Sequence, residues 1–114
     1  MIKENKIFLE HILENIKDIE LFTKGVSQEG FNNNKEKQNA VVRSLEIIGE
    51  AAKNLSENLK KKYPRVPWKE IAGTRDRIIH HYFGIDLQII WNIVKIDLPD
   101  LKKKILIIIK EMKN

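Results

Sequence analysis

The sequence has 114 residues, 42% of them hydrophobic and 32% charged, with a formal net charge of +5 at neutral pH and no cysteine. This length and composition predict a single globular domain over residues 1–114 and exclude a disulfide framework and thiolate metal sites. No apolar run approaches the roughly 18 residues of a membrane span, and the first residues lack a signal-peptide pattern. We therefore expect a cytoplasmic protein with a mild preference for polyanions.

The first predicted helix covers residues 5–24. Its large apolar residues recur every three or four positions, at Phe8, Ile12, Ile16, Ile19 and Phe22. Gly25 predicts the end of this helix, because glycine adopts the left-handed conformation that closes many helices. The polar residues 26–34 predict a loop.

The second predicted helix begins after Asn34, a good N-cap residue, and ends at the Tyr63-Pro64 pair, because the residue before proline resists helical backbone angles. Its apolar stripe consists of Val41, Leu45, Ile48, Ala52, Leu55 and Leu59. Its small residues, Gly49, Ala51 and Ala52, predict the close approach of another helix. Its charged residues Arg43, Glu46 and Glu50 fit either a solvated ladder of ion pairs or a polar patch that faces an active site.

In the C-terminal half, Pro67 predicts the start of a short helical turn, and Thr74 or the residue before it caps a helix that ends at Gly84. Asp86 caps a further helix, and Pro99 predicts a break or restart before the last one. Trp68 and Trp91 are expected in the core or an interface, and the lysine runs 60–62 and 102–104 at solvated helix ends. The chain should form an all-α antiparallel bundle of four to five helices, and its wide apolar stripes predict a homodimer.

The most informative segment spans residues 72–84, which carry two of the three histidines of the chain. Its polar residues are Arg75, Asp76, Arg77, His80, His81 and Tyr82. Arginine binds phosphate through a fixed fork of donors, and histidine moves protons near neutral pH. If the segment is helical, Asp76 lies one turn before His80 and can orient its imidazole. The pattern suggests cleavage of a phosphodiester without a metal, and an ordinary polar helix face is the competing interpretation. A metal site is disfavoured, because adjacent histidines on a helix point about 100° apart.

The arrangement Arg75, four residues, His80, one residue, Tyr82 resembles the signature of the HEPN superfamily, and specifically that of HepT-like toxins of prokaryotic toxin–antitoxin pairs. The flanking stretches 44–52, 66–71 and 82–86, together with Trp91, are also similar to the family. The resemblance covers roughly residues 5–110.

The resemblance implies a homodimer in which two motifs face one cleft, and a metal-independent endoribonuclease that needs no cofactor and cleaves tRNA or mRNA. It implies catalytic roles for Arg75, Asp76 and His80. It also implies that a minimal nucleotidyltransferase antitoxin modifies Tyr82 with AMP, which blocks the site by adding bulk and negative charge. Arg77 and His81 are candidate RNA contacts. Two other functions stay open: a non-catalytic module that binds RNA or the nucleotidyltransferase, and a plain dimeric scaffold.

Overall fold

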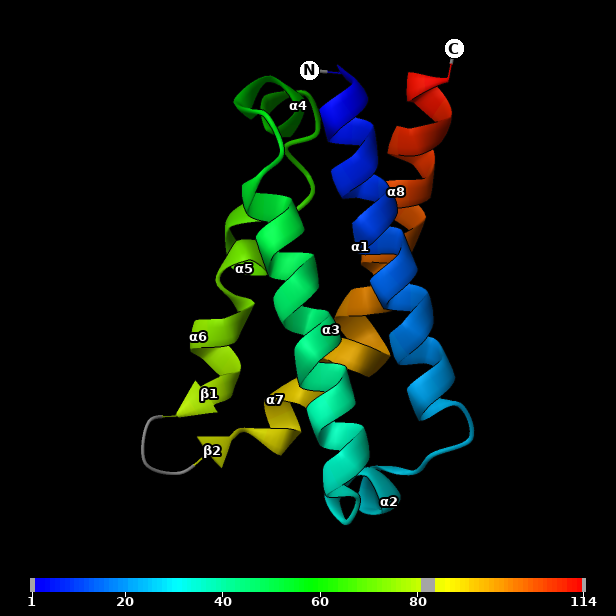
Figure 1. Cartoon of the computed structure of the whole chain (residues 1–114), viewed down its shortest axis with the longest axis vertical. Helices are drawn as coiled ribbons and strands as arrows, with labels where there is room; N and C mark the ends of the chain where they lie inside the picture. The colour runs from blue at the N-terminus through cyan, green and yellow to red at the C-terminus, as the bar shows by residue number, and fades with distance from the viewer. Residues whose placement is uncertain (1, 81–83, 114) are drawn as a thin grey trace.

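Three long helices form the frame of the protein in the computed structural model, which describes residues 2–80 and 84–113. They are α1 (Ile2–Thr23), α3 (Lys35–Lys53) and α8 (Leu98–Met112). In Figure 1, α3 runs antiparallel to α1, and α8 brings the C-terminus back to the end of the molecule that holds the N-terminus. The prediction of an all-α antiparallel bundle is therefore confirmed.

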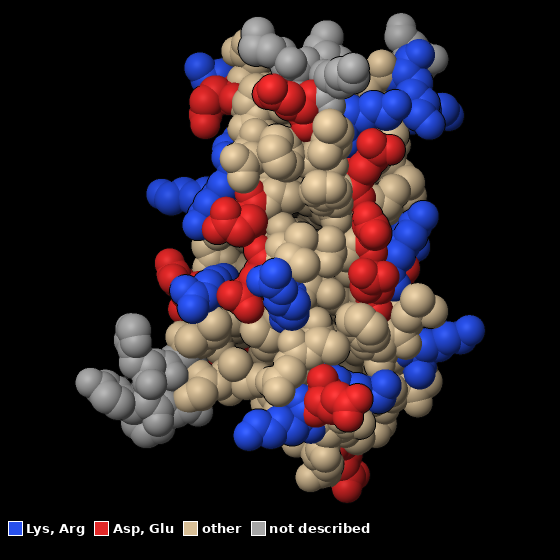
Figure 2. Space-filling model, viewed as in Figure 1, with Lys and Arg blue, Asp and Glu red and all other residues tan. Residues whose placement is uncertain are grey.

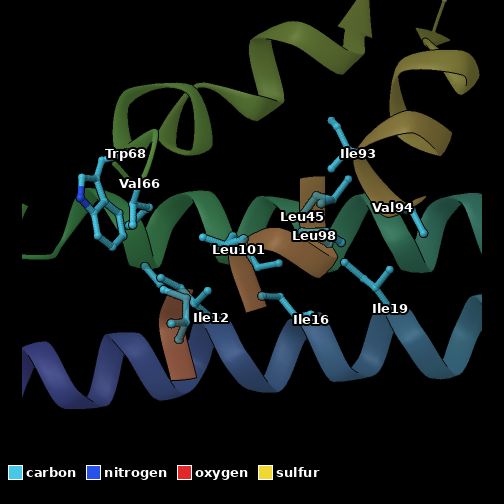
Figure 3. Close-up of a cluster of buried hydrophobic side chains, with 14 of the residues drawn as sticks. Ile12, Ile16, Ile19, Leu45, Val66, Trp68, Ile93, Val94, Leu98 and Leu101 are labelled. Atoms are coloured by element: carbon cyan, nitrogen blue, oxygen red, sulfur yellow. The ribbon is translucent and has the colours of Figure 1, made fainter. Parts of the chain in front are cut away.

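The core lies where the apolar stripes of these helices meet. Figure 3 shows side chains from α1, α3 and α8 directed toward one another, among them Ile12, Ile16, Leu45 and Leu101. The apolar residues predicted to line the second helix are all buried, as are Ile12, Ile16 and Ile19 of the first. The packing thus follows the helical periodicity of the sequence.

The segment 26–34 differs from its prediction. Helix α1 ends at Thr23, and Gly25 has the expected positive φ of 70°. The expected loop instead contains the short helix α2 (Gln28–Asn32), which Ser27 caps by accepting a hydrogen bond from the amide of Gly30 at 3.0 Å. Phe31 of α2 is fully buried and its ring lies 5.4 Å from that of Trp91. One buried aromatic residue therefore anchors a helix too short to show periodicity.

Helix α3 begins as predicted, because the Asn34 side chain accepts a hydrogen bond from the amide of Lys37 at 3.0 Å. It ends at Lys53, however, about ten residues before the predicted end. The chain restarts as α4 (Glu57–Lys62), and the stripe residues Leu55 and Leu59 are still buried.

Three hydrogen bonds of Ser56 explain this break. Its hydroxyl caps α4 by accepting from the amide of Leu59 at 3.2 Å. Its own amide donates to the side-chain oxygen of Asn5 at 3.0 Å, and the Asn5 amide group donates to the Ser56 hydroxyl at 2.9 Å. Helix α1 thus supplies partners that a continuous helix would have supplied itself.

The small residues of α3 let α5 (Trp68–Ala72) approach closely, as predicted. A Cβ atom added to Gly49 would lie 3.2 Å from the carbonyl oxygen of Ile71, which is tighter than ordinary van der Waals contact. Trp68 is buried and donates its indole N–H to the carbonyl of Tyr63 at 3.0 Å. The contact at Gly49 places the next helix, α6 (Thr74–Ile78), beside α3.

The predicted helix over residues 74–84 is wrong beyond Ile78. The chain forms a two-stranded antiparallel ribbon from β1 (Ile79–His80) and β2 (Gly84–Ile85), at the lower left of Figure 1. The carbonyl of Ile78 accepts from the amide of Asp86 at 2.8 Å, whereas in a continuing helix it would accept from the amide four residues on. Gly84 has a positive φ of 79° and opens β2 rather than ending a helix. The N-cap position of α6 is Gly73, the residue before Thr74 and one of the two predicted alternatives; the Thr74 hydroxyl donates to the carbonyl of Ile71 at 2.8 Å.

The last part of the chain is helical throughout. Helix α7 (Leu87–Asn92) begins with the predicted cap, since the Asp86 side chain accepts from the amide of Ile89 at 3.0 Å. A π-helical stretch, η1 (Ile93–Asp97), joins α7 to α8. Pro99 lies in the first turn of α8 and lacks an amide hydrogen, so the predicted irregularity takes the form of a widened turn.

The charged residues lie on the surface and are interleaved in sign, as Figure 2 shows. Lys102 pairs with Glu20 at 3.0 Å and Lys104 with Asp100 at 2.9 Å, so these lysines have acidic partners on the surface. Within residues 2–80 and 84–113, no helix combines the length and apolar character needed to cross a bilayer.

Candidate functional site

The central contact of the site joins the motif helix to the long helix α3. The guanidinium nitrogen Nε of Arg75, in α6, lies 3.2 Å from the carboxylate oxygen Oε2 of Glu46. The Arg75 side chain is 67% exposed and that of Glu46 is 30% exposed. The contact connects residues 29 positions apart in the sequence, and it depends on the close packing of α5 against α3 at Gly49.

Both residues of this ion pair line a pocket of about 470 Å³. Its walls come from the α5–α6 segment, through Ala72 and Arg75, and from α3, whose charged residues in the pocket are Arg43, Glu46, Glu50 and Lys53. Over this side of the molecule, Figure 2 shows basic and acidic side chains placed close together. The pocket is open to solvent and contains arginine side chains, so an anionic ligand can enter and find charge-assisted hydrogen-bond donors.

Glu46 and Glu50 of α3 both line the pocket but have different ionic partners. Glu50 pairs with Lys53 one turn later at 3.7 Å, and both side chains are more than half exposed, as expected of a solvated pair. Glu46 instead contacts the candidate catalytic arginine. The sequence signal for this role was the spacing of Arg43, Glu46 and Glu50 on one helix, which did not identify the residue that turns toward Arg75.

The two arginines of the motif face different surroundings. Arg75 lines the pocket beside Glu46, whereas Arg77 lines a separate pocket of about 250 Å³. The mainly apolar walls of this second pocket come from α3, α5, η1 and α8, and they also carry three carboxylates, Glu70, Asp97 and Asp100. Both arginines are exposed. The structure therefore does not bring Arg77 to the same pocket as Arg75, and its expected RNA contact stays a prediction.

The remaining predicted site residues follow Arg75 along the chain. Asp76 is exposed on α6, while the backbone of His80 belongs to β1 and pairs with Gly84. Because the helix ends at Ile78, Asp76 and His80 do not lie one turn apart on a helix, and the helical spacing predicted for them is wrong. The role of Asp76 stays a prediction. His81 and Tyr82 lie outside the described residues.

Among the side chains that the structure describes, which do not include those of His80 and His81, no three metal-ligating carboxylates or imidazoles converge. The groups that the structure does assemble are a guanidinium, a carboxylate beside it, and a histidine-bearing strand directly after the arginine helix. A guanidinium can hold a phosphate whose charge rearranges, and a histidine can transfer its proton.

Comparison with known proteins agrees with this chemistry. Residues 12–108 match the family described as "Ribonuclease HepT-like". A "Putative RNase" from Methanocaldococcus jannaschii is 51% identical over 112 residues, which cover 98% of this chain and 93% of that protein. A "Probable ribonuclease HepT" from Thermococcus cleftensis is 47% identical over 104 residues, which cover 91% of this chain and 94% of that protein.

A third relative from Methanocaldococcus jannaschii, named "Gamma-glutamylcyclotransferase and putative RNase", is 49% identical over 98% of this chain but only 50% of its own length. No solved structure matches the chain significantly. The family match covers most of the bundle, including α6 and β1, and the full-length relatives exceed 40% identity. The chain therefore belongs to the HepT-like ribonuclease family of the HEPN superfamily.

Proposed function

We propose that this protein is the toxin of a prokaryotic toxin–antitoxin pair and that it cleaves tRNA or mRNA as a metal-independent endoribonuclease. The observation that carries the proposal is Arg75 at the mouth of a solvent-open pocket, with His80 on the strand that follows its helix. The membership of the chain in a ribonuclease family supports RNA as the substrate. We place the reaction in the cytoplasm, where its RNA targets would be.

The proposed reaction is attack by the ribose 2′-hydroxyl on the adjacent phosphate. His80 removes the proton of this hydroxyl or gives a proton to the departing 5′-oxygen, and Arg75 holds the phosphate oxygens while negative charge builds up on them. Asp76 assists from the position next to Arg75. The products are a 2′,3′-cyclic phosphate and a 5′-hydroxyl, and neither a water molecule nor a metal ion enters the bond-breaking step.

A homodimer would complete this site. One histidine cannot serve as base and acid in the same step, and a symmetric pair of chains brings two copies of the motif to one cleft. Sedimentation equilibrium tests this part directly, since the mass of a single chain at micromolar concentration would contradict it.

We further propose that a minimal nucleotidyltransferase antitoxin silences the toxin by transferring AMP to Tyr82. An added phosphate brings negative charge and bulk to a site built for an anion, so RNA would be repelled and excluded. Mass spectrometry of the toxin co-expressed with its antitoxin would detect the added AMP. A Tyr82→Phe variant should remain unmodified and toxic.

The catalytic proposal is tested with purified protein and labelled RNA in the presence of a chelator. The wild type should produce fragments that end in cyclic phosphate, and Arg75→Ala and His80→Ala should lose at least roughly a hundredfold in rate, the lower end of what a general acid or base contributes. His11→Ala is the matched control, because His11 is an exposed histidine on α1. Stable RNA binding without fragments would favour a non-catalytic RNA-binding module instead. Equal growth arrest by the wild type and His80→Ala would also contradict the proposal.

A further inference from the structure

We infer that Glu46 is a positioning residue for the ribonuclease reaction: it holds the Arg75 guanidinium in the orientation that receives the phosphate. This inference rests on the proposed function of Arg75. Its physical basis is the ion pair between Arg75 Nε and Glu46 Oε2 at 3.2 Å, at the wall of the pocket of about 470 Å³.

The nitrogen that Glu46 contacts decides what remains free for a substrate. An arginine has five N–H donors in a planar fork, of which Nε carries one and the two terminal nitrogens carry four. A carboxylate at Nε occupies one edge of the plane and leaves another edge for a second anion. Among residues 2–80 and 84–113, Glu46 is the residue whose carboxylate forms an ion pair with Arg75.

Arg75 needs such a partner because its own helix does not immobilise it. Helix α6 has five residues, ends at Ile78, and leaves the Arg75 side chain 67% exposed. A long exposed side chain loses rotamer freedom when it binds a phosphate, and an existing ion pair provides part of that order in advance. Glu46 suits this task, because it comes from the 19-residue helix α3 and is only 30% exposed.

The rigid contact between α3 and α5 defines the distance that the ion pair spans. Gly49 follows Glu46 by one turn on α3 and packs against the carbonyl of Ile71, three residues before Thr74 starts α6. This contact fixes the separation between α3, which carries Glu46, and the α5–α6 segment, which carries Arg75. Because it involves only backbone atoms, a change of side-chain rotamer cannot break it.

The test compares Glu46→Gln with Glu36→Gln, using steady-state cleavage of a short RNA. Both variants remove one negative charge from α3, but Glu36 is an exposed residue in the first turn of this helix and does not line the pocket. Glu46→Gln should lower kcat about two- to fivefold with little change in KM, the size expected of one partly exposed ion pair. Glu36→Gln should keep the wild-type kcat. A kcat that is unchanged or raised in Glu46→Gln overturns the inference, because a raised value would mean that Glu46 competes with the phosphate.

A double-variant comparison shows whether Glu46 acts through Arg75. Arg75→Lys keeps the positive charge and removes the Nε donor, so adding Glu46→Gln to it should change kcat less than about twofold. An undiminished effect of Glu46→Gln in that background contradicts the inference.

A readout that does not need activity separates this inference from the proposed function. The Nε–H signal of Arg75 in proton–nitrogen NMR spectra should shift and exchange faster in Glu46→Gln than in the wild type, and should not change in Glu36→Gln. If neither the wild type nor any variant cleaves RNA, the proposed function fails, but this NMR measurement still tests the ion pair. An unaltered Arg75 signal in Glu46→Gln means that the pair does not hold the guanidinium.

Discussion

Replacing Phe31 with alanine should destabilise the protein by about 3 kcal/mol, although the sequence of residues 26–34 predicts a loop. The Phe31 side chain is fully buried, and burial of such a side chain contributes roughly 1.5–3 kcal/mol. Its ring packs 5.4 Å from that of Trp91, and an aromatic pair adds about 0.5–1.5 kcal/mol. The sum overlaps the range of about 3–5 kcal/mol typical of Phe→Ala substitutions in cores. A loss near the lower end is expected, because α2 has only five residues and can partly collapse into the cavity.

Urea unfolding followed by circular dichroism measures this change, which should lower the midpoint without altering the slope. In a thermal scan, about 3 kcal/mol corresponds to a fall in Tm of roughly 12 °C for a domain of this size. Leu21→Ala is the control, because that apolar side chain is 71% exposed and its loss should cost less than about 0.5 kcal/mol. If Phe31→Ala costs less than about 1 kcal/mol, the packing argument for α2 is wrong.

Two further predictions concern contacts that hold the helices together. Gly49→Val should destabilise the protein by about 1–3 kcal/mol in urea unfolding, because the added Cβ meets the Ile71 carbonyl at 3.2 Å; a midpoint at or above that of the wild type would contradict this. The hydroxyl of Tyr63 donates to Glu111 at 2.5 Å, which raises the pKa of Tyr63 above 10.0. The stabilisation of the folded protein by this hydrogen bond is present below pH 10 and is lost as the pH rises through the pKa of Tyr63 in the folded state. In a Tyr82→Phe background, Glu111→Gln should lower the pKa of Tyr63 in an ultraviolet absorbance titration. An unchanged pKa would refute Glu111 as the cause of the raised value.

The long helices could be predicted from the sequence, because their signals are local. The apolar residues of α1 and α3 repeat at the helical period, and the caps at Asn34 and Asp86 act on amides only three residues away. Gly25 likewise ends α1 through its own backbone angles. The residues of the family signature also lie within eight positions of the sequence, from Arg75 to Tyr82, so the candidate arginine and histidine could be named without a structure.

Two of the misjudged elements depend on partners far along the chain. The second helix breaks where Asn5 binds Ser56, 51 residues away. Helix α2 exists because Phe31 packs on Trp91.

The site shows the same division. Its residue types and the helix that carries Arg75 were determined by the sequence alone. The end of that helix at Ile78 and the pairing of Arg75 with Glu46 were decided by the tertiary structure, through the amide of Asp86 and the close packing at Gly49. Periodicity reports which face of a helix is apolar, whereas a polar contact between two helices depends on how closely their backbones approach, and that distance is a property of the folded chain.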